Sequence, residues 1–591
     1  MNKYVSLVFC FLGLIGVFMG GCKSKSEARQ QAGETEDTRF DKFKNNLVLK
    51  FWRIHPEWAS SVGYHRYDNI LTIPDNKYRR GLVRSYKSYL KELEAFAQHK
   101  LSENNQTDFY MLQNFLAAGI WRVDEFKDYK WNPAIYNIGP VVADMVNGRY
   151  DSLDNRLRTL SQRIAYSTVY YEAAINNVKN PTVAHTQLAI LQNKGALIVL
   201  GPALIDSVQA AHLNPAEKNL LNQRIETTRL AIDNYIRHLQ ENILPAIKKG
   251  KTRSFRIGQS QYTQKFNFEN ESGYTANEIY QRANLEKHKI HRAMLALTKQ
   301  LWPKYFPKQA MPAGLPAVKQ MINRLSQQHV PRDSFITAIR QQIPALEKFV
   351  NTRHLLTQDP TQPLIVRATP LYMQGVAGAS VSAPGPYEKN AATYYNVTPL
   401  THYTPAQAES YLREYNTYTL QILNIHEAIP GHYTQLVYSN KSPSVIKAIL
   451  GNNAMIEGWA VYAERMMLEQ GYGRNSPEMW LMWYKWNLRV TLNAILDYSV
   501  HVLNMSEEEA LQLLTQEGFQ EEAEAREKWK RVTISQVQLT SYFTGYTEIM
   551  NLRDELKSKA GKNFNLKNFH EKFLSYGSAP VRYIRDMMLE N

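Results

Sequence analysis

The sequence predicts a mainly α-helical protein, with one large body of many helices and a small β-sheet just before its motif helix. Apolar residues recur every three or four positions over most of 39–591, which is the periodicity of helices that bury one face. Only 362–400 mixes β-branched and aromatic residues with Gly and Pro, as short strands and turns do. The 591 residues are 44% hydrophobic and 21% charged, a composition typical of a globular protein.

The N-terminus has the order of a secretory signal, predicted over residues 1–21. Lys3 precedes an apolar run, and the small residues Gly20 and Gly21 stand before Cys22. The letters FMGGC resemble a bacterial lipoprotein processing box, which predicts cleavage before Cys22 and its acylation. An ordinary signal peptide or a short membrane anchor is the alternative. Residues 22–38 carry almost nothing apolar and are predicted to be a flexible tether.

This leader predicts an exported protein of the bacterial cell envelope, held to a membrane through its lipid only. No later stretch approaches the ~20 uninterrupted apolar residues that span a bilayer. Lys23 is not the aspartate that commonly retains lipoproteins at an inner membrane, so the outer membrane is the expected location. The two cysteines, Cys10 and Cys22, both lie in the leader or at its end, which excludes an internal disulfide in the mature chain.

The formal net charge of +16 falls to +15 when the leader with its single charged residue, Lys3, is removed. Such an excess suits anionic surfaces or ligands. The basic residues are spread along amphipathic helices and interleaved with acids, however, and this pattern favours a solvated surface over a nucleic-acid site. We therefore expect no nucleic-acid partner.

Residues 39–591 are predicted to form one helical domain, because they contain no fixed-period repeat and no Pro- or Ser-rich linker. The strand-containing part is expected at about 362–400 and the helices of the functional site at about 405–470. Helical periodicity beyond the strands predicts helices over 405–440, 443–470, 477–503, 506–516, 520–557 and 566–590.

The stretch HEAIPGH, residues 426–432, resembles the H-E-x-x-H pattern of zinc hydrolase helices but contains two additional residues before the second histidine. On an ideal helix six residues rotate by about 600°, so His426 and His432 would point about 120° apart. Pro430 removes a backbone donor and Gly431 tolerates unusual backbone angles, which suits a bulge that absorbs the two extra residues. With such a bulge both histidines reach one metal ion.

The third metal ligand is predicted to be Glu457, which follows His432 on what reads as the next helix. Three protein ligands leave a fourth position for water, and two histidines with one glutamate favour a single zinc over manganese or cobalt. Glu464, two turns beyond Glu457, is suited to orient a ligand histidine. Glu427 is suited to act as the general base. A structural cluster of buried polar groups is the alternative.

The motifs HEAIPGH and EGWAVYAE resemble the signature of a bacterial family catalogued as domain of unknown function 885, many of whose members are predicted lipoproteins. The likeness extends over nearly the whole chain through PEWASSVGYHRYD, NPTVAHTQLAILQNKGA, FRIGQSQYTQKF, YYNVTP, QLTSYFTGYTEIMNLR and FHEKFLSYGSAP. The family is in turn similar to the gluzincin peptidases.

This resemblance implies an oligopeptidase-like helical body with a deep central cleft, and a zinc ion held by two histidines and a glutamate. On this sequence it points to His426, His432 and Glu457 as ligands and Glu427 as base. The two-residue insertion in the motif is the departure from the gluzincin pattern.

Gluzincins also use a Tyr or His donor to the oxyanion, and Tyr542 and Tyr546 are the candidates. They lie four apart on one helical face, and Gly545 between them permits a close backbone approach. Core tyrosines in a Tyr-rich protein are the alternative. Arg553, seven residues later, is a candidate for holding a substrate carboxylate, with an ordinary surface arginine as the simpler interpretation.

These observations predict an exported zinc-dependent metallopeptidase that hydrolyses short peptides. The small sheet is suited to pair with an extended peptide substrate by strand addition. Two alternatives remain open, a zinc hydrolase of another amide or ester, and an envelope lipoprotein that binds metal or peptide without catalysis. The sequence does not set the oligomeric state.

Overall fold

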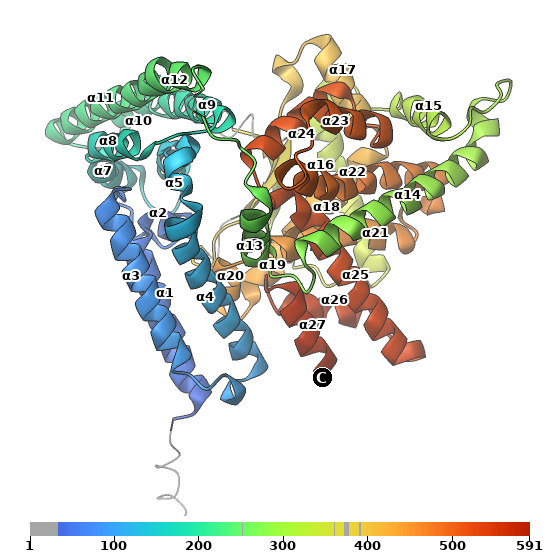
Figure 1. Cartoon of the computed structure of the whole chain (residues 1–591), viewed down its shortest axis with the longest axis horizontal. Helices are drawn as coiled ribbons and strands as arrows, with labels where there is room; N and C mark the ends of the chain where they lie inside the picture. The colour runs from blue at the N-terminus through green and yellow to red at the C-terminus, as the bar shows by residue number, and fades with distance from the viewer. Residues whose placement is uncertain (1–33, 251, 360, 371–377, 389–391, 591) are drawn as a thin grey trace, which may run out of the picture.

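The computed structural model describes residues 34–250, 252–359, 361–370, 378–388 and 392–590. Helices dominate and one small three-stranded sheet is present, so the predicted mainly helical class is confirmed (Figure 1). The predicted signal peptide and the predicted lipidation at Cys22 lie outside the described residues.

Three long N-terminal helices lie side by side at the left of Figure 1, in blue. The first begins after Thr35, whose hydroxyl caps it by accepting from the N–H of Thr38, and it ends just before Pro56. Its apolar face enters the main core. The helices of this region are α1 (Glu36–Ile54), α2 (Pro56–Ser61), α3 (Asn76–Glu94) and α4 (Glu103–Trp121).

A second hydrophobic core lies in the helices that follow, drawn in cyan and teal to green in Figure 1. One stretch there, Val183–Ala210, has the length and hydropathy of a membrane span, but Ala189 and Ala196 pack in this core and Gly201 interrupts the helix. The helices are α5 (Asp128–Trp131), α6 (Gly139–Asn147), α7 (Leu153–Ile164), α8 (Ser167–Asn177), α9 (Val183–Val199), α10 (Pro202–Ala210), α11 (Pro215–Arg237) and α12 (Leu244–Lys248).

The remaining helices form the body that carries the predicted site. Its centre is α22, which is buried on almost every side, and α14 packs along it. The helices are α13 (Gly258–Asn270), α14 (Ala276–Tyr305), α15 (Leu315–Ser326), α16 (Phe335–Thr352), α17 (Pro405–Glu414), α18 (Thr419–Glu427), α19 (His432–Lys441), α20 (Val445–Ile449), α21 (Asn453–Glu469), α22 (Pro477–His501), α23 (Glu507–Gln512), α24 (Glu522–Ile534), α25 (Ser541–Ala560), α26 (Leu566–Ser575) and α27 (Val581–Glu590).

Several predicted helices are split in the structure. The segment 405–440 forms three helices rather than one, and 520–557 is divided between α24 and α25. The second break is held by Asp497, whose carboxylate accepts from the backbone N–H groups of Val537 and Leu539. Val537 adopts a φ of 72°, an unfavourable angle for a β-branched residue, so the fold around it imposes this turn.

The predicted sheet before the motif helix is confirmed. It consists of β1 (Leu364–Ala368), β2 (Ala379–Ser382) and β3 (Thr393–Val397), in the order β1-β3-β2. The central strand β3 runs parallel to β1 and antiparallel to β2. Tyr395 of β3 donates its hydroxyl to Oδ1 of Asn424 at 2.9 Å, which fixes the sheet against α18 two residues before His426.

Candidate metal centre

The motif HEAIPGH breaks the helix where a bulge was predicted. Helix α18 ends at Glu427 and α19 begins at His432, with Ala428 to Gly431 forming an irregular turn that contains a cis Ile429–Pro430 bond. Gly431 donates its backbone N–H to the carbonyl of Ile425 at 3.0 Å. A Cβ atom at Gly431 would lie 1.9 Å from the carbonyl oxygen of His426, so only glycine fits this turn.

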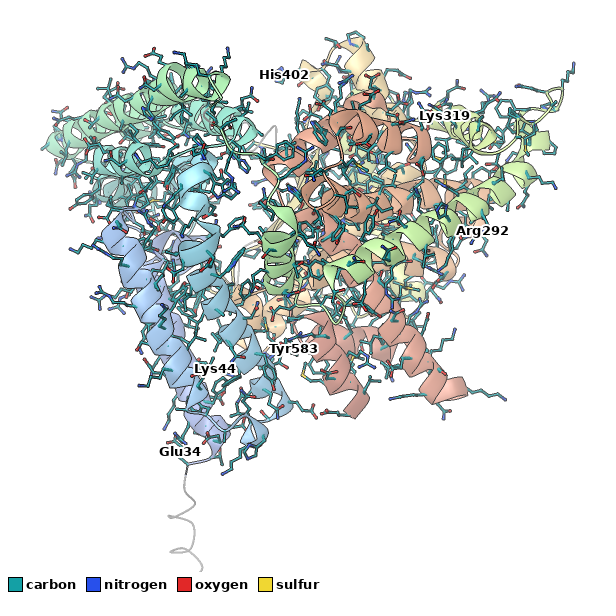
Figure 2. The ribbon with its side chains drawn as sticks, in the orientation of Figure 1. Glu34, Lys44, Arg292, Lys319, His402 and Tyr583 are labelled. Carbon is teal, nitrogen blue, oxygen red and sulfur yellow. The ribbon has the colours of Figure 1, made fainter. Side chains whose placement is uncertain are left out.

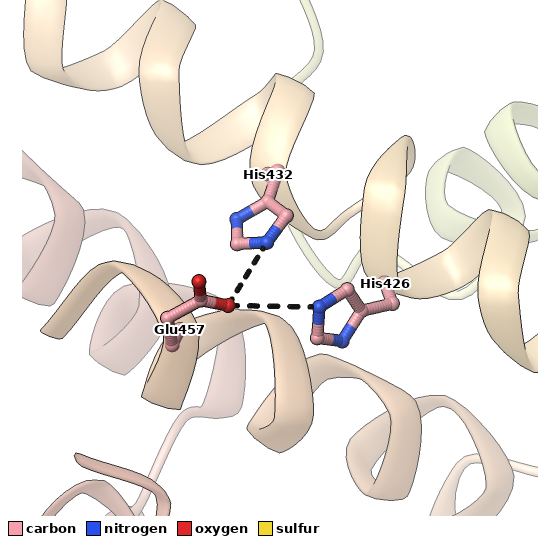
Figure 3. Close-up of side chains that lie close together, drawn as sticks. All are labelled: His426, His432 and Glu457. Carbon is pink, nitrogen blue, oxygen red and sulfur yellow. Dashed lines mark ion pairs between the residues drawn. The ribbon is translucent and has the colours of Figure 1, made fainter. Parts of the chain in front are cut away.

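This turn brings the two predicted histidines together, and α21 supplies the predicted glutamate (Figure 3). Nε2 of His432 lies 3.4 Å and Nε2 of His426 lies 3.8 Å from Oε2 of Glu457. The three donor atoms are within 4.8 Å of one another. Within the described ranges, no other group of three His, Cys, Asp or Glu side chains is arranged in this way.

The donor set fits a zinc ion. Ligand atoms around a tetrahedral zinc at about 2.1 Å lie roughly 3.4 Å apart, close to the two distances to Glu457. The side chains of His426, His432 and Glu457 are only 8, 13 and 15% exposed. Two imidazole nitrogens and one carboxylate oxygen are ligands that zinc accepts, and water can complete the set.

The protonation of the histidines is set by burial and by the neighbouring carboxylates. Burial, assisted by the nearby His432, lowers the pKa of His426 to about 4, so this imidazole is neutral near pH 7 and its nitrogen is available to a metal. Burial alone would lower the pKa of His432 too, but its contact with Glu457 outweighs that effect and raises this pKa.

Glu464, the residue predicted to orient a ligand histidine, contacts His426. Its Oε1 is 2.7 Å from Nδ1 of His426 and accepts from Nε1 of Trp486 at 3.0 Å. The side chain is fully buried, and burial raises the pKa of this carboxyl well above its ordinary value. The contact at Nδ1 leaves Nε2 of His426 directed at Glu457, which is the orientation that metal binding requires.

Glu427, the predicted base, is the last residue of α18 and is partly exposed. Its charge acts on both His426 and His432, so the carboxylate lies beside the two imidazoles. No hydrogen bond or ion pair joins its carboxylate to any residue that the structure describes. It is therefore free to accept a proton from a bound molecule.

The two candidate tyrosines have different surroundings. The Tyr542 ring lies nearly parallel to that of His426 with their centroids 6.5 Å apart, and its hydroxyl contacts the Glu457 side chain. Burial raises the pKa of Tyr542 to about 12, so the phenol keeps its proton near neutral pH. Tyr546 instead accepts from Nη1 of Arg465 at 2.9 Å. Only Tyr542 is placed at the predicted ligands.

Helices α21 and α25 approach closely enough to bring Tyr542 to Glu457. A Cβ atom at Gly545 would lie 1.7 Å from the carbonyl oxygen of Ala454, and one at Gly458 would lie 2.3 Å from the backbone of Gly545. Both glycines are therefore required at this crossing, in agreement with the close approach expected at Gly545.

Arg553, the residue that the sequence suggested for binding a substrate carboxylate, is paired with a glutamate of the protein itself. Its Nη1 atom donates to Oε2 of Glu469 at 2.7 Å, and Nε of Arg465 donates to the other oxygen of Glu469. Sequence reasoning missed Arg531, whose Nη2 donates to the hydroxyl of Tyr542 at 3.2 Å, and Trp486, which holds Glu464. Neither belongs to a local motif.

Residues 56–588 match the family described as bacterial protein of unknown function, DUF885. The chain belongs to the DUF885 family. This assignment confirms the family resemblance seen in the sequence. No curated protein matches this DUF885 protein.

Two solved structures share the fold of this DUF885 protein. A putative lipoprotein of unknown function from Shewanella oneidensis is 48% identical, with a TM-score of 0.84, over 93% of this chain and 99% of that one. A putative lipoprotein from Colwellia psychrerythraea is 16% identical, with a TM-score of 0.77, over 94% of this chain and 99% of that one. The second likeness concerns the fold alone.

The gluzincin-like body and the central cleft stay predictions for this DUF885 protein. A cavity of about 530 Å³ lies among α15, α17, α23 and α24. Lys319, which is labelled in Figure 2, is part of its lining. A smaller one of about 250 Å³ lies between the segment before β3 and α19. The predicted metal ligands line neither of these two cavities.

Proposed function

We propose that this protein is an exported, lipid-anchored zinc-dependent peptidase that hydrolyses short peptides. The observation that carries the proposal is the convergence of His426, His432 and Glu457 beside an unpaired carboxylate, that of Glu427. His426 and His432 both direct a ring nitrogen at the same carboxylate oxygen of Glu457, so three donor atoms converge on one position. Such an arrangement is typical of a catalytic metal site.

The chain has a candidate for each group that amide hydrolysis requires. A zinc ion held by the three ligands would polarise the scissile carbonyl and lower the pKa of a water molecule. Glu427 would take a proton from a water molecule there as the water oxygen attacks the carbonyl carbon. The same proton would pass to the leaving nitrogen as the C–N bond breaks, which would give a carboxylic acid and an amine. Tyr542, whose ring lies beside that of His426, would donate to the carbonyl oxygen.

The location in the envelope is supported by the leader sequence and by the relatives. The FMGGC stretch places a cysteine directly after small residues, as lipoprotein processing requires. The similar protein from Shewanella oneidensis is itself described as a putative lipoprotein. We propose acylation at Cys22 and retention at the outer membrane.

Metal content tests the first half of the proposal. The chain without residues 1–22 is purified, and its zinc is measured by elemental analysis beside the variants His432→Ala and His402→Ala. His402 is an exposed histidine outside the site and serves as the matched control. About one zinc per chain is expected in the parent and in the control, with loss in His432→Ala. Equal zinc in all three proteins would contradict the proposal.

Activity tests the second half. Glu427→Gln is expected to retain zinc and to lose at least about a hundredfold in peptide hydrolysis, because general base catalysis contributes about 10²–10⁴. Glu508→Gln, at an exposed glutamate on α23, is the control and should keep full activity. Zinc binding without hydrolysis of any peptide would favour the non-catalytic alternative, and cleavage of esters alone would favour another zinc hydrolase.

A further inference from the structure

A basic face of α24 adjoins the proposed metal centre. Arg531 donates Nη2 to the Tyr542 hydroxyl at 3.2 Å, and its guanidinium carbon lies 6.0 Å from the centroid of that ring. The Tyr542 hydroxyl also contacts Glu457. Arg531 therefore contacts a tyrosine that itself lies beside a predicted metal ligand.

Arg531 has no carboxylate partner among the residues that the structure describes. Its other contact is Oε1 of Gln538 at 2.7 Å, which is neutral, and the side chain is partly exposed. Nearby arginines are neutralised within the protein. Arg489 is 2.5 Å from Glu524, and Arg465 is 2.7 Å from Glu469.

Lys528 lies one turn before Arg531 on the same helix and is only 4% exposed. No carboxylate oxygen of a described residue lies within 4.0 Å of its ammonium group. Burial, together with the positive charge of Arg489, lowers the pKa of Lys528. A buried ammonium without a counter-ion is costly, and a bound anion would remove this cost.

The carboxylates whose charges act on Lys528 are paired with other cations. Two carboxylates, those of Glu414 and Glu524, are shared by Lys485 and Arg489 at distances of 2.5 to 3.8 Å. Neither carboxylate forms an ion pair with Arg531, whose guanidinium stays charged, or with Lys528, whose lowered pKa favours the neutral amine until an anion binds. A guanidinium with unused donors fits the two oxygens of a carboxylate.

We propose that Arg531, assisted by Lys528, binds a substrate carboxylate, and that the enzyme therefore acts on peptides with a free C-terminus close to the scissile bond. This proposal rests on the proposed hydrolase function. Tyr542, the donor proposed for the scissile carbonyl, directly contacts Arg531. Since one residue spans about 3.8 Å, the carboxylate belongs to the first or second residue after the cleaved bond. The enzyme then releases single residues or dipeptides from the C-terminus.

The test uses N-acetyl tetra-alanine and its C-terminal amide, with the zinc-loaded parent, Arg531→Gln and Arg526→Gln. Arg526 lies on the same helix, is 54% exposed and pairs with Glu522, which makes it the matched control. The parent and the control should prefer the free acid by about 10- to 100-fold in kcat/KM, the range of one charged hydrogen bond. Arg531→Gln should lose this preference through a higher KM for the acid.

Two results would overturn the proposal. The first is equal cleavage of acid and amide by the parent. The second is an equal loss on both peptides in Arg531→Gln, which would mean that Arg531 only positions Tyr542. Lys528→Met provides a second variant and should lower the preference for the acid in the same direction.

A binding measurement separates this proposal from the proposed hydrolysis. The Kd of each peptide is measured by calorimetry on zinc-loaded Glu427→Gln, with and without Arg531→Gln. Tighter binding of the acid that requires Arg531 supports the carboxylate site even where the parent cleaves neither peptide. Equal binding of acid and amide overturns it even where the parent hydrolyses both.

Discussion

Nδ1 of His426 lies 2.7 Å from Oε1 of Glu464, and the same oxygen accepts from Nε1 of Trp486. Through this contact Glu464, which is no ligand itself, fixes the ring orientation of a proposed ligand. We predict that Glu464→Gln weakens zinc binding about 10- to 100-fold, because such outer partners set the basicity and orientation of a metal-bound imidazole.

Competition with a chromophoric chelator measures this affinity. Glu469→Gln on the same helix is the control, because Glu469 pairs with Arg465 and Arg553 rather than with a proposed ligand. It should bind zinc like the parent. An unchanged zinc affinity in Glu464→Gln would show that His426 is not oriented in this way.

The tight turn at Gly431 has no room for a side chain, and we predict that adding a methyl group there disrupts the metal site. In Gly431→Ala the new methyl group would lie 1.9 Å from the carbonyl oxygen of His426, so the turn has to open and His432 has to move. Loss of most of the bound zinc and a drop of at least about 2 kcal/mol in the free energy of unfolding are expected. Elemental analysis and urea denaturation measure the two effects.

Gly195→Ala provides the control for this substitution. Gly195 lies within α9, and a Cβ atom there meets nothing within 4 Å. Alanine at that position should stabilise the protein by about 0.5–1 kcal/mol, since glycine is unfavourable inside a helix. If Gly431→Ala behaved like Gly195→Ala, the tight turn would not be needed for the site.

The parts of the structure that could be predicted from sequence are those with local signals. Helical periodicity predicted the class, and the mixture of β-branched residues, Gly and Pro predicted the sheet at 362–400. The motif letters and their spacing identified His426, His432 and Glu457, which the structure brings together. Each of these signals lies within a few tens of residues.

The remaining features depend on contacts between distant segments. Arg531 of α24 contacts Tyr542 of α25 across a break where Asp497 accepts from the backbone N–H of Val537. Val537 itself adopts a φ that is unfavourable for a β-branched residue. The second core was not predicted either, because helical periodicity shows that a face is buried but not which helices bury it.

A buried ion cluster ties the N-terminal helices to the body that carries the site. Asp108 of α4 lies 2.8 Å from the ammonium of Lys44, labelled in Figure 2, and 2.6 Å from that of Lys447 on α20. The side chains of Asp108 and Lys447 are fully buried. Asp108→Asn leaves the buried ammonium of Lys447 without a counter-ion, while Lys44 keeps Asp41 at 2.9 Å, so the free energy of unfolding should fall by about 3–5 kcal/mol.

The exposed pair Lys50–Glu92 allows a matched comparison, because its atoms are 3.3 Å apart and its side chains are more than 40% exposed. Glu92→Gln should change the free energy of unfolding by less than about 1 kcal/mol. Urea denaturation of both variants gives the two values. Equal effects would mean that the Asp108 cluster contributes no more than a surface pair.

From the contacts of His65 we predict that the protein loses stability at alkaline pH. Its Nδ1 lies 2.9 Å from Asp68, its Nε2 faces Glu388 across 3.6 Å, and its ring stacks on Tyr150. Burial alone would lower the pKa of His65, but the two carboxylates outweigh it and raise this pKa to about 9. Because the folded pKa exceeds the unfolded value of about 6.5, the stabilisation is complete below pH 6.5 and disappears as the pH rises through 9.

Between pH 6.5 and 9.5 the free energy of unfolding should fall in both the parent and His65→Gln, and by roughly 1–2 kcal/mol more in the parent. This figure is smaller than the full pKa shift implies, because solvent screens the partly exposed His65. His212→Gln, at a histidine whose side chain is 94% exposed, should keep the pH profile of the parent. Urea denaturation at each pH measures the difference. If the free energies of unfolding of the parent and His65→Gln changed in parallel with pH, His65 would not carry a proton in this contact. If the two free energies converged above pH 9, the alkaline loss of stability would be assigned to deprotonation of His65.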